Sequence, residues 1–343
     1  MPIDVHAHYV PPRVVEELER AGDRYGISVV MHEPTCRKCL RFEHGLQIRP
    51  FFEKLQEPAT QRIDAMHRLG LTHQVLSAWA DIFAYALPPE KCDAWHHLLN
   101  DTMAEFCATH PRQFSWLASV PLPHAAHAAR ELERSVRTMG AVGAVVATHI
   151  EGMNLGDAPL DEFWATAQAL DVPVFLHPAQ PAPLPRTARY SLNTVAQYTF
   201  DSTLCIGSLI GSGVLDRFPG LRLIASHGGG TVPFLIGRFD IMHERAERKS
   251  QANVAVHAPS AYLRRFWYDT ILHHPKPLQY LADMVQTDRL VIGTDDGFPP
   301  HDADPMGMLR RAEFSAADIL TIAEHNPRAL FRLAHAGEPP THA

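Results

Sequence analysis

Several features that would assign this chain to other classes of protein are missing from its sequence. No apolar run reaches the roughly 18 residues that a membrane-spanning helix needs. The N-terminus lacks a basic segment followed by an apolar stretch and a small-residue cleavage site. The formal net charge of −7 and the pI of about 6.3 argue against a nucleic-acid-binding surface. We therefore expect a cytoplasmic protein that binds neither a membrane nor a nucleic acid.

Cysteine is also sparse, since the 343 residues include only five cysteines. An odd, scattered set in a chain of this size indicates reduced thiols rather than a disulfide framework. The closest pair, Cys36 and Cys39, lies between His32 and His44 in "MHEPTCRKCLRFEH". We interpret the two cysteines as a reduced pair on a surface hairpin, and a structural zinc site is the alternative.

The sequence does contain a repeated alternation of short apolar runs with helical patterns, such as those over 89–109, 124–139 and 160–170. Eight such runs predict a parallel (β/α)8 TIM-type barrel of the α/β class. A doubly wound open sheet is the alternative. The eight predicted strands are 3–8, 73–78, 115–120, 141–149, 172–177, 221–227, 265–270 and 289–295.

The predicted strands are unevenly spaced along the chain. We assign residues 1–335 to a single domain and 336–343 to a loose tail. Residues 20–56 form an insertion after the first strand, which we expect to cover the mouth of the barrel as a lid. Two more long connections, 178–203 and 236–262, are predicted to be lids or interface elements.

Histidines and an aspartate stand at the ends of four predicted strands. His6 and His8 are two residues apart on the first strand and therefore point to the same face. His177, His227 and Asp295 each end another predicted strand. A barrel brings these ends together at its functional rim. Imidazole and carboxylate ligands predict a divalent metal site, with zinc favoured and manganese or iron possible.

Three histidines and one aspartate, completed by a water molecule, would hold the ion, which leaves one histidine as a base. His227 is the better base, because the three glycines after it leave room for a substrate. Asp295 is the predicted ligand because it directly ends the strand, and Asp296 is expected to cap the following loop. The fourth strand lacks the lysine that often bridges two metals in such barrels, so we predict one ion that lowers the pKa of a bound water.

Four motifs together resemble a known family: "DVHAHYVPP", "FLHP", "ASHGGGTVPFLIGR" and "IGTDDGFP". They are similar to amidohydrolase-related proteins, which include aminocarboxymuconate-semialdehyde decarboxylase and decarboxylases of resorcylate, carboxyvanillate and isoorotate. The resemblance extends over nearly the whole chain. It implies zinc bound by His6, His8, His177 and Asp295, with His227 as the catalytic acid and base.

The resemblance also implies two arginines that bind the substrate carboxylate, Arg49 and Arg238. In the family the second one reaches across from a neighbouring subunit, which implies a homodimer. A guanidinium group grips a carboxylate through two parallel hydrogen bonds. A surface salt bridge is the alternative for either residue.

One departure from the family concerns the pocket. A tryptophan that lines the substrate site in the muconate decarboxylase has no counterpart in 178–226, where Tyr190, Tyr198 and Phe200 are the aromatic candidates. The sequence therefore leaves the substrate open.

The function that we predict is non-oxidative decarboxylation of a carboxylated aromatic or muconate-type acid, a small-molecule carboxylate, with His227 and Asp295 as catalytic residues. The first alternative is a metal-dependent hydrolase or hydratase acting on a ring-cleavage product or a lactone. The second is a barrel that binds a metal or a ligand without catalysis.

Overall fold

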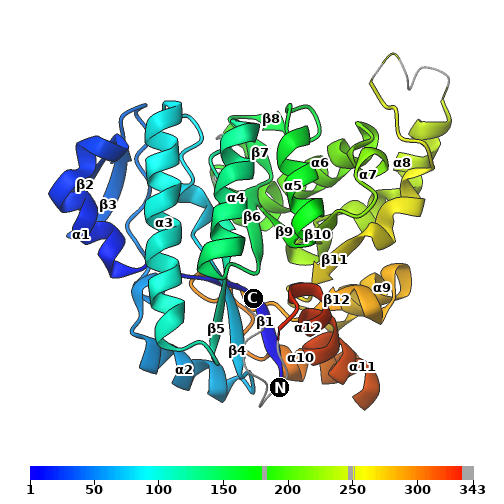
Figure 1. Cartoon of the computed structure of the whole chain (residues 1–343). Coiled ribbons are helices and arrows are strands. Elements are labelled where there is room, and N and C mark those ends of the chain that lie inside the picture. The colour runs from blue at the N-terminus through cyan, green and yellow to red at the C-terminus, as the bar shows by residue number, and fades with distance from the viewer. Residues whose placement is uncertain (180–183, 246–249, 251, 334–343) are drawn as a thin grey trace.

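A computed structural model describes residues 1–179, 184–245, 250 and 252–333 of the chain. Eight parallel strands form one sheet with helices around it, which confirms the predicted TIM-type barrel (Figure 1). Each strand of this sheet overlaps one of the eight predicted runs. In sheet order the strands are β1 (Ile3–His8), β4 (His73–Ser77), β5 (Phe114–Ser119), β6 (Gly143–Ala147), β9 (Pro173–His177), β10 (Arg222–Ala225), β11 (Phe266–Asp269) and β12 (Leu290–Val291).

The sheet closes where the chain that follows β12 meets β1. The Val5 amide donates to the Ile292 carbonyl at 2.9 Å, and the Asp295 amide donates to the His6 carbonyl at 2.8 Å. The His8 amide donates to the Asp296 carbonyl, also at 2.8 Å. These bonds close the ring that distinguishes a barrel from an open sheet. They also bring the last predicted ligand beside the first two.

The strands are rich in apolar residues, which allows both of their faces to be buried. Every residue of β1, β6 and β9 is buried, as expected for parallel strands between a packed interior and an outer layer of helices. The predicted helices over 89–109, 124–139 and 160–170 are α3 (Pro89–Thr109), α4 (Ala125–Met139) and α5 (Asp161–Leu170). In Figure 1 these three helices lie along the outside of the strands.

The remaining helices complete the outer layer and the connections. They are α1 (Pro12–Ala21), α2 (Ala59–Arg68), α6 (Tyr198–Gly211), α7 (Val214–Arg217), α8 (Val232–Glu244), α9 (Pro275–Val285), α10 (Pro305–Arg311), α11 (Ala316–Leu320) and α12 (Asn326–Phe331). A two-stranded hairpin, β7 (His149–Ile150) and β8 (Met153–Asn154), follows β6.

The insertion over 20–56 has two parts. Its first part is an antiparallel hairpin, β2 (Ile27–His32) and β3 (Arg37–Phe42), which lies beside α1 at the blue edge of Figure 1. Its last part returns to the carboxyl end of β1, where the Val10 amide donates to the Leu55 carbonyl at 2.7 Å. Only this last part, over 49–56, is placed against the rim by described contacts. The lid role of the whole insertion stays a prediction.

Two connections are more helical than we expected. Helix α6 begins at Tyr198, inside the connection predicted over 178–203, and α8 continues to Glu244, inside the one predicted over 236–262. Both helices carry apolar residues to the core and to the surface, which weakened the amphipathic signal in the sequence. The predicted tail, 336–343, lies outside the described residues.

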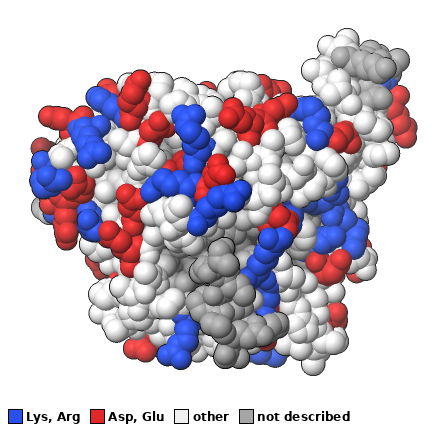
Figure 2. Space-filling model, viewed as in Figure 1, with Lys and Arg blue, Asp and Glu red and all other residues white. Residues whose placement is uncertain are grey.

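The outer surface carries charges of both signs. On the face drawn in Figure 2, acidic and basic side chains are interspersed over the outer helices. Among the described helices, none is long and apolar enough to cross a membrane.

Candidate metal centre

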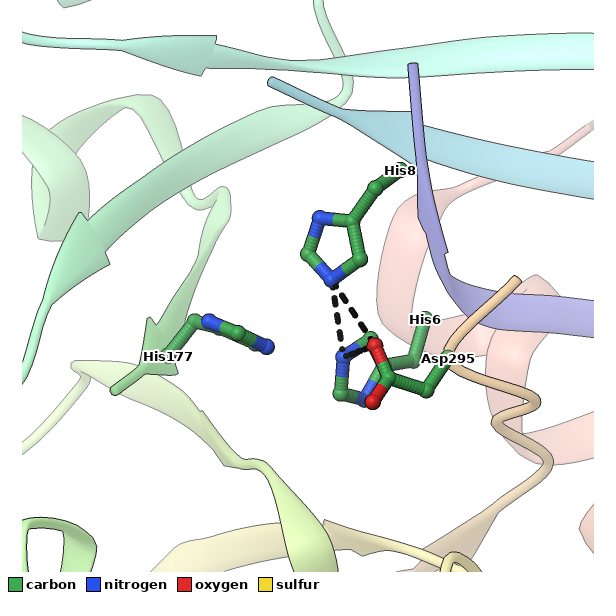
Figure 3. Close-up of side chains that lie close together, drawn as sticks. All are labelled: His6, His8, His177 and Asp295. Carbon is green, nitrogen blue, oxygen red and sulfur yellow. Dashed lines mark hydrogen bonds and ion pairs between the residues drawn. The ribbon is translucent and has the colours of Figure 1, made fainter. Parts of the chain in front are cut away.

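The four predicted metal ligands lie together inside the carboxyl rim of the barrel (Figure 3). One ligand atom from each of His6, His8, His177 and Asp295 lies within 4.8 Å of the others. The Nε2 atoms of His6 and His8 are 3.1 Å apart, and Asp295 Oδ1 lies 3.4 and 3.2 Å from them. All four residues are buried. Three imidazoles and a carboxylate that converge in this way suit zinc, iron or manganese.

His6 is oriented by a carboxylate that our sequence analysis missed. Its Nδ1 lies 2.6 Å from Asp269 Oδ2, and both side chains are fully buried. A proton on Nδ1 facing this carboxylate leaves Nε2 free to bind a metal. Burial by itself lowers the pKa of His6, but Asp295 and Asp269 outweigh it and raise the pKa to about 10. Before a metal binds, the carboxylates therefore favour a proton on His6.

His177 has the opposite electrostatic environment. Burial lowers its pKa well below the usual value, and positive charge on His8, His6 and His227 lowers it further. Neither of its ring nitrogens has a hydrogen-bond partner, although the side chain is buried. A buried neutral imidazole without a partner is costly by itself, but it is the state that binds a metal. This observation shows that the residues fit a divalent ion.

Asp295 reaches the cluster from an irregular segment. Strand β12 ends at Val291, so Asp295 does not directly end a strand as we predicted, and its φ of 58° is left-handed. This turn aims its carboxylate at the histidines. Burial raises the pKa of Asp295, but His6, His227 and His8 outweigh burial and bring the pKa well below its usual value. The carboxylate is therefore ionised and ready to bind a cation.

Asp296 has a different role from the loop cap that we expected. Its Oδ2 accepts a hydrogen bond from Arg62 Nη1 at 2.9 Å, and its Oδ1 accepts one from Lys54. It is buried, as are Arg62 and the neighbouring Gln74. Asp296 therefore faces away from the metal ligands and into an ion pair.

His227 lies beside the cluster but is not one of its four predicted ligands. Its Nε2 is 3.6 Å from Asp295 Oδ2. The strand before it ends at Ala225, so His227 also lies beyond its strand, with a left-handed φ of 52°. Gly228, Gly229 and Gly230 follow with positive φ angles, and a side chain on Gly230 would meet the Thr199 carbonyl at 2.2 Å. The tight loop that positions His227 therefore needs its glycines.

The Arg49 side chain lies near the centre, above a group of aromatic rings. Its guanidinium carbon is 4.8, 5.4 and 5.6 Å from the ring centroids of Phe52, Trp79 and Phe298. The Phe298 ring is in turn 5.0 Å from the ring of His8. Because the Arg49 side chain is 49% exposed, one face of it is available to a solute.

Of the three aromatic candidates in 178–226, Tyr198 is the one with an electrostatic link to this region. Burial raises the pKa of its phenol, the carboxylates of Asp81 and Asp295 act in the same direction, and Arg49 opposes them. The phenol therefore lies close enough to Arg49 and Asp295 to interact with both electrostatically. Tyr190 and Phe200, by contrast, are 84% and 51% exposed.

Arg238 and the cysteine motif are not brought to the centre. Arg238 is exposed on α8, and within the described residues no hydrogen bond or ion pair joins it to the His/Asp cluster of its own chain. Cys36 is exposed and Cys39 is buried, and both are free thiols. Among the described residues, the one group of potential metal ligands is the His/Asp cluster, so the reduced pair and the structural zinc site both stay predictions for the cysteine motif.

Our sequence analysis missed two residues of the centre, Asp269 and Arg62, and only Asp269 had a signal in the sequence. Asp269 is the last but one residue of the predicted strand "RFWYDT" and the last residue of β11, which places it near a strand end like the other functional residues. Arg62, by contrast, lies in a helical pattern that contains several charged residues. No local signal separates it from its exposed neighbours.

A barrel with a His/Asp metal site at its carboxyl rim defines a class of metal-dependent enzyme. Comparison with known proteins specifies the family. The amidohydrolase family profile matches residues 3–333, and the chain belongs to this family.

The curated relatives are decarboxylases. The chain is 29% identical over 299 residues to 2-amino-3-carboxymuconate-6-semialdehyde decarboxylase of Dictyostelium discoideum, covering 87% of this chain and 82% of that protein. It is 30% identical over 298 residues to gamma-resorcylate decarboxylase of a Rhizobium species, covering 79% and 86%. These relatives support the expectation of a carboxy-lyase enzyme.

Solved structures agree on the fold. A 5-carboxyvanillate decarboxylase from Sphingomonas paucimobilis has a TM-score of 0.81 at 23% identity, covering 97% of this chain and 99% of that one. A dihydroxybenzoic acid decarboxylase from a Polaromonas species, solved with manganese and 2-nitroresorcinol, has a TM-score of 0.74 at 24% identity, covering 98% of each chain.

Proposed function

We propose that this protein is a metal-dependent, non-oxidative decarboxylase of a carboxylated aromatic or muconate-type unsaturated acid. The observation that carries the proposal is the position of His227, whose Nε2 lies 3.6 Å from Asp295 Oδ2 beside four convergent ligands. An imidazole next to a metal centre is suited to move a proton between solvent and a bound substrate. The relatives named above act on acids of this chemical class.

The ion that we propose is zinc, with manganese or iron as alternatives, held by His6, His8, His177 and Asp295. When bound, a divalent ion supplies a Lewis acid that polarises an oxygen ligand. The manganese in the Polaromonas structure supports the class of ion without deciding which one this chain selects.

His227 is the proposed proton donor. Protonation of a ring or alkene carbon makes that carbon tetrahedral, and the carboxylate then leaves as carbon dioxide while its bonding electrons return to the conjugated system. One proton is consumed and one carbon dioxide is released. The adjacent backbone is held in place, because the Gly228 amide donates to Asp269 Oδ1 at 3.0 Å. Asp269 therefore contacts both the His227 loop and the ligand His6.

Arg49 is the proposed partner of the substrate carboxylate within the same subunit. Its guanidinium lies over the rings of Phe52, Trp79 and Phe298, which attract a cation. The long contact of 3.8 Å to Asp81 leaves hydrogen-bonding capacity for a carboxylate. Flat aromatic walls beside a guanidinium suit a planar, conjugated acid.

Arg238 is the proposed second carboxylate partner, contributed to the site of a neighbouring subunit in a homodimer. Phe234, Arg238 and Ile241 follow one another at helical spacing on one face of α8, and the two apolar residues are 79% and 64% exposed. Helix α6 packs on α8 and itself carries exposed Phe200 and Leu204. Exposed apolar residues gathered in this way are typical of an interface between subunits.

The test is a carbon dioxide release assay over a panel of carboxylated aromatics and muconates, on protein loaded with zinc or manganese. We expect release from at least one acid, and we expect His227→Ala to abolish it while metal content is kept. Full activity of His227→Ala would contradict the proton-donor role. Reactions in isotope-labelled water distinguish the alternative, because a hydrolase or hydratase would transfer the labelled oxygen to the product.

A further inference from the structure

Arg62 on α2 is one of the largest fully buried side chains in the described part of the protein. An arginine is seldom completely buried unless its charge and its donors are paired. The hydrogen-bond acceptors around Arg62 therefore indicate which parts of the chain it connects.

The guanidinium binds four acceptors from separate parts of the chain. Nη1 donates to Asp296 Oδ2 at 2.9 Å and to Gln74 Oε1 at 3.1 Å. Nη2 donates to the carbonyls of His8 and Lys54, both at 2.9 Å. These bonds join β1, β4, the segment after β12 and the end of the insertion.

Three of the four acceptors lie next to proposed functional residues. His8 is itself a metal ligand, and Asp296 directly follows the ligand Asp295. Lys54 lies in the 49–56 segment that begins with Arg49, and its ammonium group also pairs with Asp296. A single guanidinium thus contacts the backbone of one proposed ligand, the residue that follows a second one, and the chain segment that carries Arg49.

We propose that Arg62 is a positioning residue that holds His8, the Asp295–Asp296 segment and the Arg49–Lys54 segment in one fixed arrangement. This inference rests on the proposed function, because it assigns Arg62 a role toward that same metal centre. Arg62 itself is separated from the reacting atoms by the backbone of His8.

Lysine cannot replace arginine in this role. The planar guanidinium presents its donors in a fixed fork, whereas a lysine ammonium is a point charge on a flexible stem. Arg62→Lys keeps the charge opposite Asp296, but it cannot reach four acceptors that lie in different directions. The substitution therefore tests whether the directions of the guanidinium donors are needed in addition to the positive charge.

The experiment compares Arg62→Lys with Arg328→Lys in the full-length protein. Arg328 is also buried, but it pairs with Glu324, which in turn binds the amino group of Met1 at the opposite end of β1. Each protein is stripped of metal and titrated with zinc, its melting temperature is measured, and hydrogen exchange is followed over 49–56.

We expect Arg62→Lys to bind zinc about 10- to 100-fold more weakly, as for partners that orient metal ligands. We also expect faster amide exchange over 49–56. Arg328→Lys should lose melting temperature but keep the zinc affinity and the exchange pattern of the wild type. Unchanged zinc affinity in Arg62→Lys, or an equal loss in both variants, would overturn the inference.

Two further measurements distinguish a failure of the proposed function from a failure of the positioning role of Arg62. A wild-type protein that does not bind zinc or manganese would overturn the proposed function and this inference with it. If Arg62→Lys does not fold, Asp296→Asn tests the same arrangement, because it removes the charge that Arg62 Nη1 faces. Zinc affinity equal to that of the wild type in Asp296→Asn would then refute the positioning role.

Discussion

The two residues that face each other at the edge of the metal centre, His227 and Asp295, both have left-handed backbone angles. This conformation costs a non-glycine residue of the order of 1–3 kcal/mol, so it persists only where the surrounding structure enforces it. Here the glycines after His227 and the bonds from the Asp295 segment to β1 enforce it. In both cases the side chain leaves the line of the strand and turns toward the same point.

The first prediction concerns His177, the proposed ligand whose ring nitrogens have no hydrogen-bond partner. His177→Ala should reduce the bound metal per chain to a small fraction, because it removes one of the four proposed ligands from a buried site. Metal content after dialysis measures this effect. His67→Ala, which changes an exposed histidine on α2, is the matched control and should keep its metal. Equal metal content in the two variants would show that His177 is not a ligand.

The second prediction concerns the phenol of Tyr198. Tyr198→Phe should raise KM about 5- to 10-fold with a smaller change in kcat, because one hydrogen bond to a bound acid is worth about 1 kcal/mol. Tyr190→Phe is the control, since Tyr190 is 84% exposed. Steady-state kinetics on the acid identified by the carbon dioxide assay provide the measurement. A KM that stays at the wild-type value would place Tyr198 outside the pocket.

At the scale of elements, the outer helices are joined by buried charge as well as by apolar contacts. His97 on α3 pairs with Glu131 on α4, with 2.7 Å between Nε2 and Oε2. Burial raises the pKa of Glu131, but bonds from Arg134, His97 and Asn100 outweigh it and lower the pKa to about 2. The pair raises the pKa of His97 above 6.5.

This pair gives the third prediction, a pH dependence of stability. Because the folded-state pKa of His97 is raised, its contribution is complete below pH 6.5 and is lost as the pH rises through the raised value. The difference in unfolding free energy between wild type and His97→Gln should therefore shrink at alkaline pH. It should stay below about 1 kcal/mol, since the His97 side chain is 49% exposed.

Urea denaturation at a series of pH values measures this difference, with His67→Gln as the control on an exposed helix position. A difference that grows with pH would contradict the proposed ion pair. A difference equal to that of His67→Gln at every pH would show that the pair contributes nothing.

At the scale of the whole molecule, the position of Arg238 needs explanation. It is exposed on α8 among apolar residues, and described contacts do not connect it with the metal centre of its own chain. A carboxylate partner in that position is useful only if another subunit brings its own site to it. The proposed homodimer supplies that site.

The fourth prediction tests this arrangement by mixing two inactive chains. Co-expressed His227→Ala and Arg238→Ala subunits should form hybrid dimers in which one site has both an intact His227 and an intact Arg238 from the partner. Activity should recover in the mixture although each variant alone is inactive or nearly so. If Arg238 acts within its own chain, each site lacks one residue and no recovery occurs.

Sedimentation of the wild type and of Phe234→Glu is the companion measurement. We expect a dimer for the wild type and a monomer for the variant, because a charge placed in an apolar interface is costly. A wild-type monomer would refute the proposed homodimer and the assignment of Arg238 to a partner site.

Local periodicity was sufficient to predict the eight strands and helices α3, α4 and α5, because buried strands and amphipathic helices have short-range signatures. It was not sufficient at the strand ends. The predicted strand 289–295 is regular only over Leu290–Val291, and the predicted strand 221–227 ends at Ala225. The left-handed turns at Asp295 and His227 depend on their tertiary partners.

The ligand residues could be proposed from the sequence because strand geometry decides their orientation: side chains two apart share a face, and parallel strands end at one rim. The contact between His6 and Asp269 and the contacts of Arg62 with four segments could not be predicted from the sequence. The residues of the first pair, for example, are 263 positions apart. Only closure of the ring decides which distant residues become neighbours. The sequence alone therefore determined which residues could bind a metal, and the tertiary structure decided which distant carboxylate and which arginine contact them.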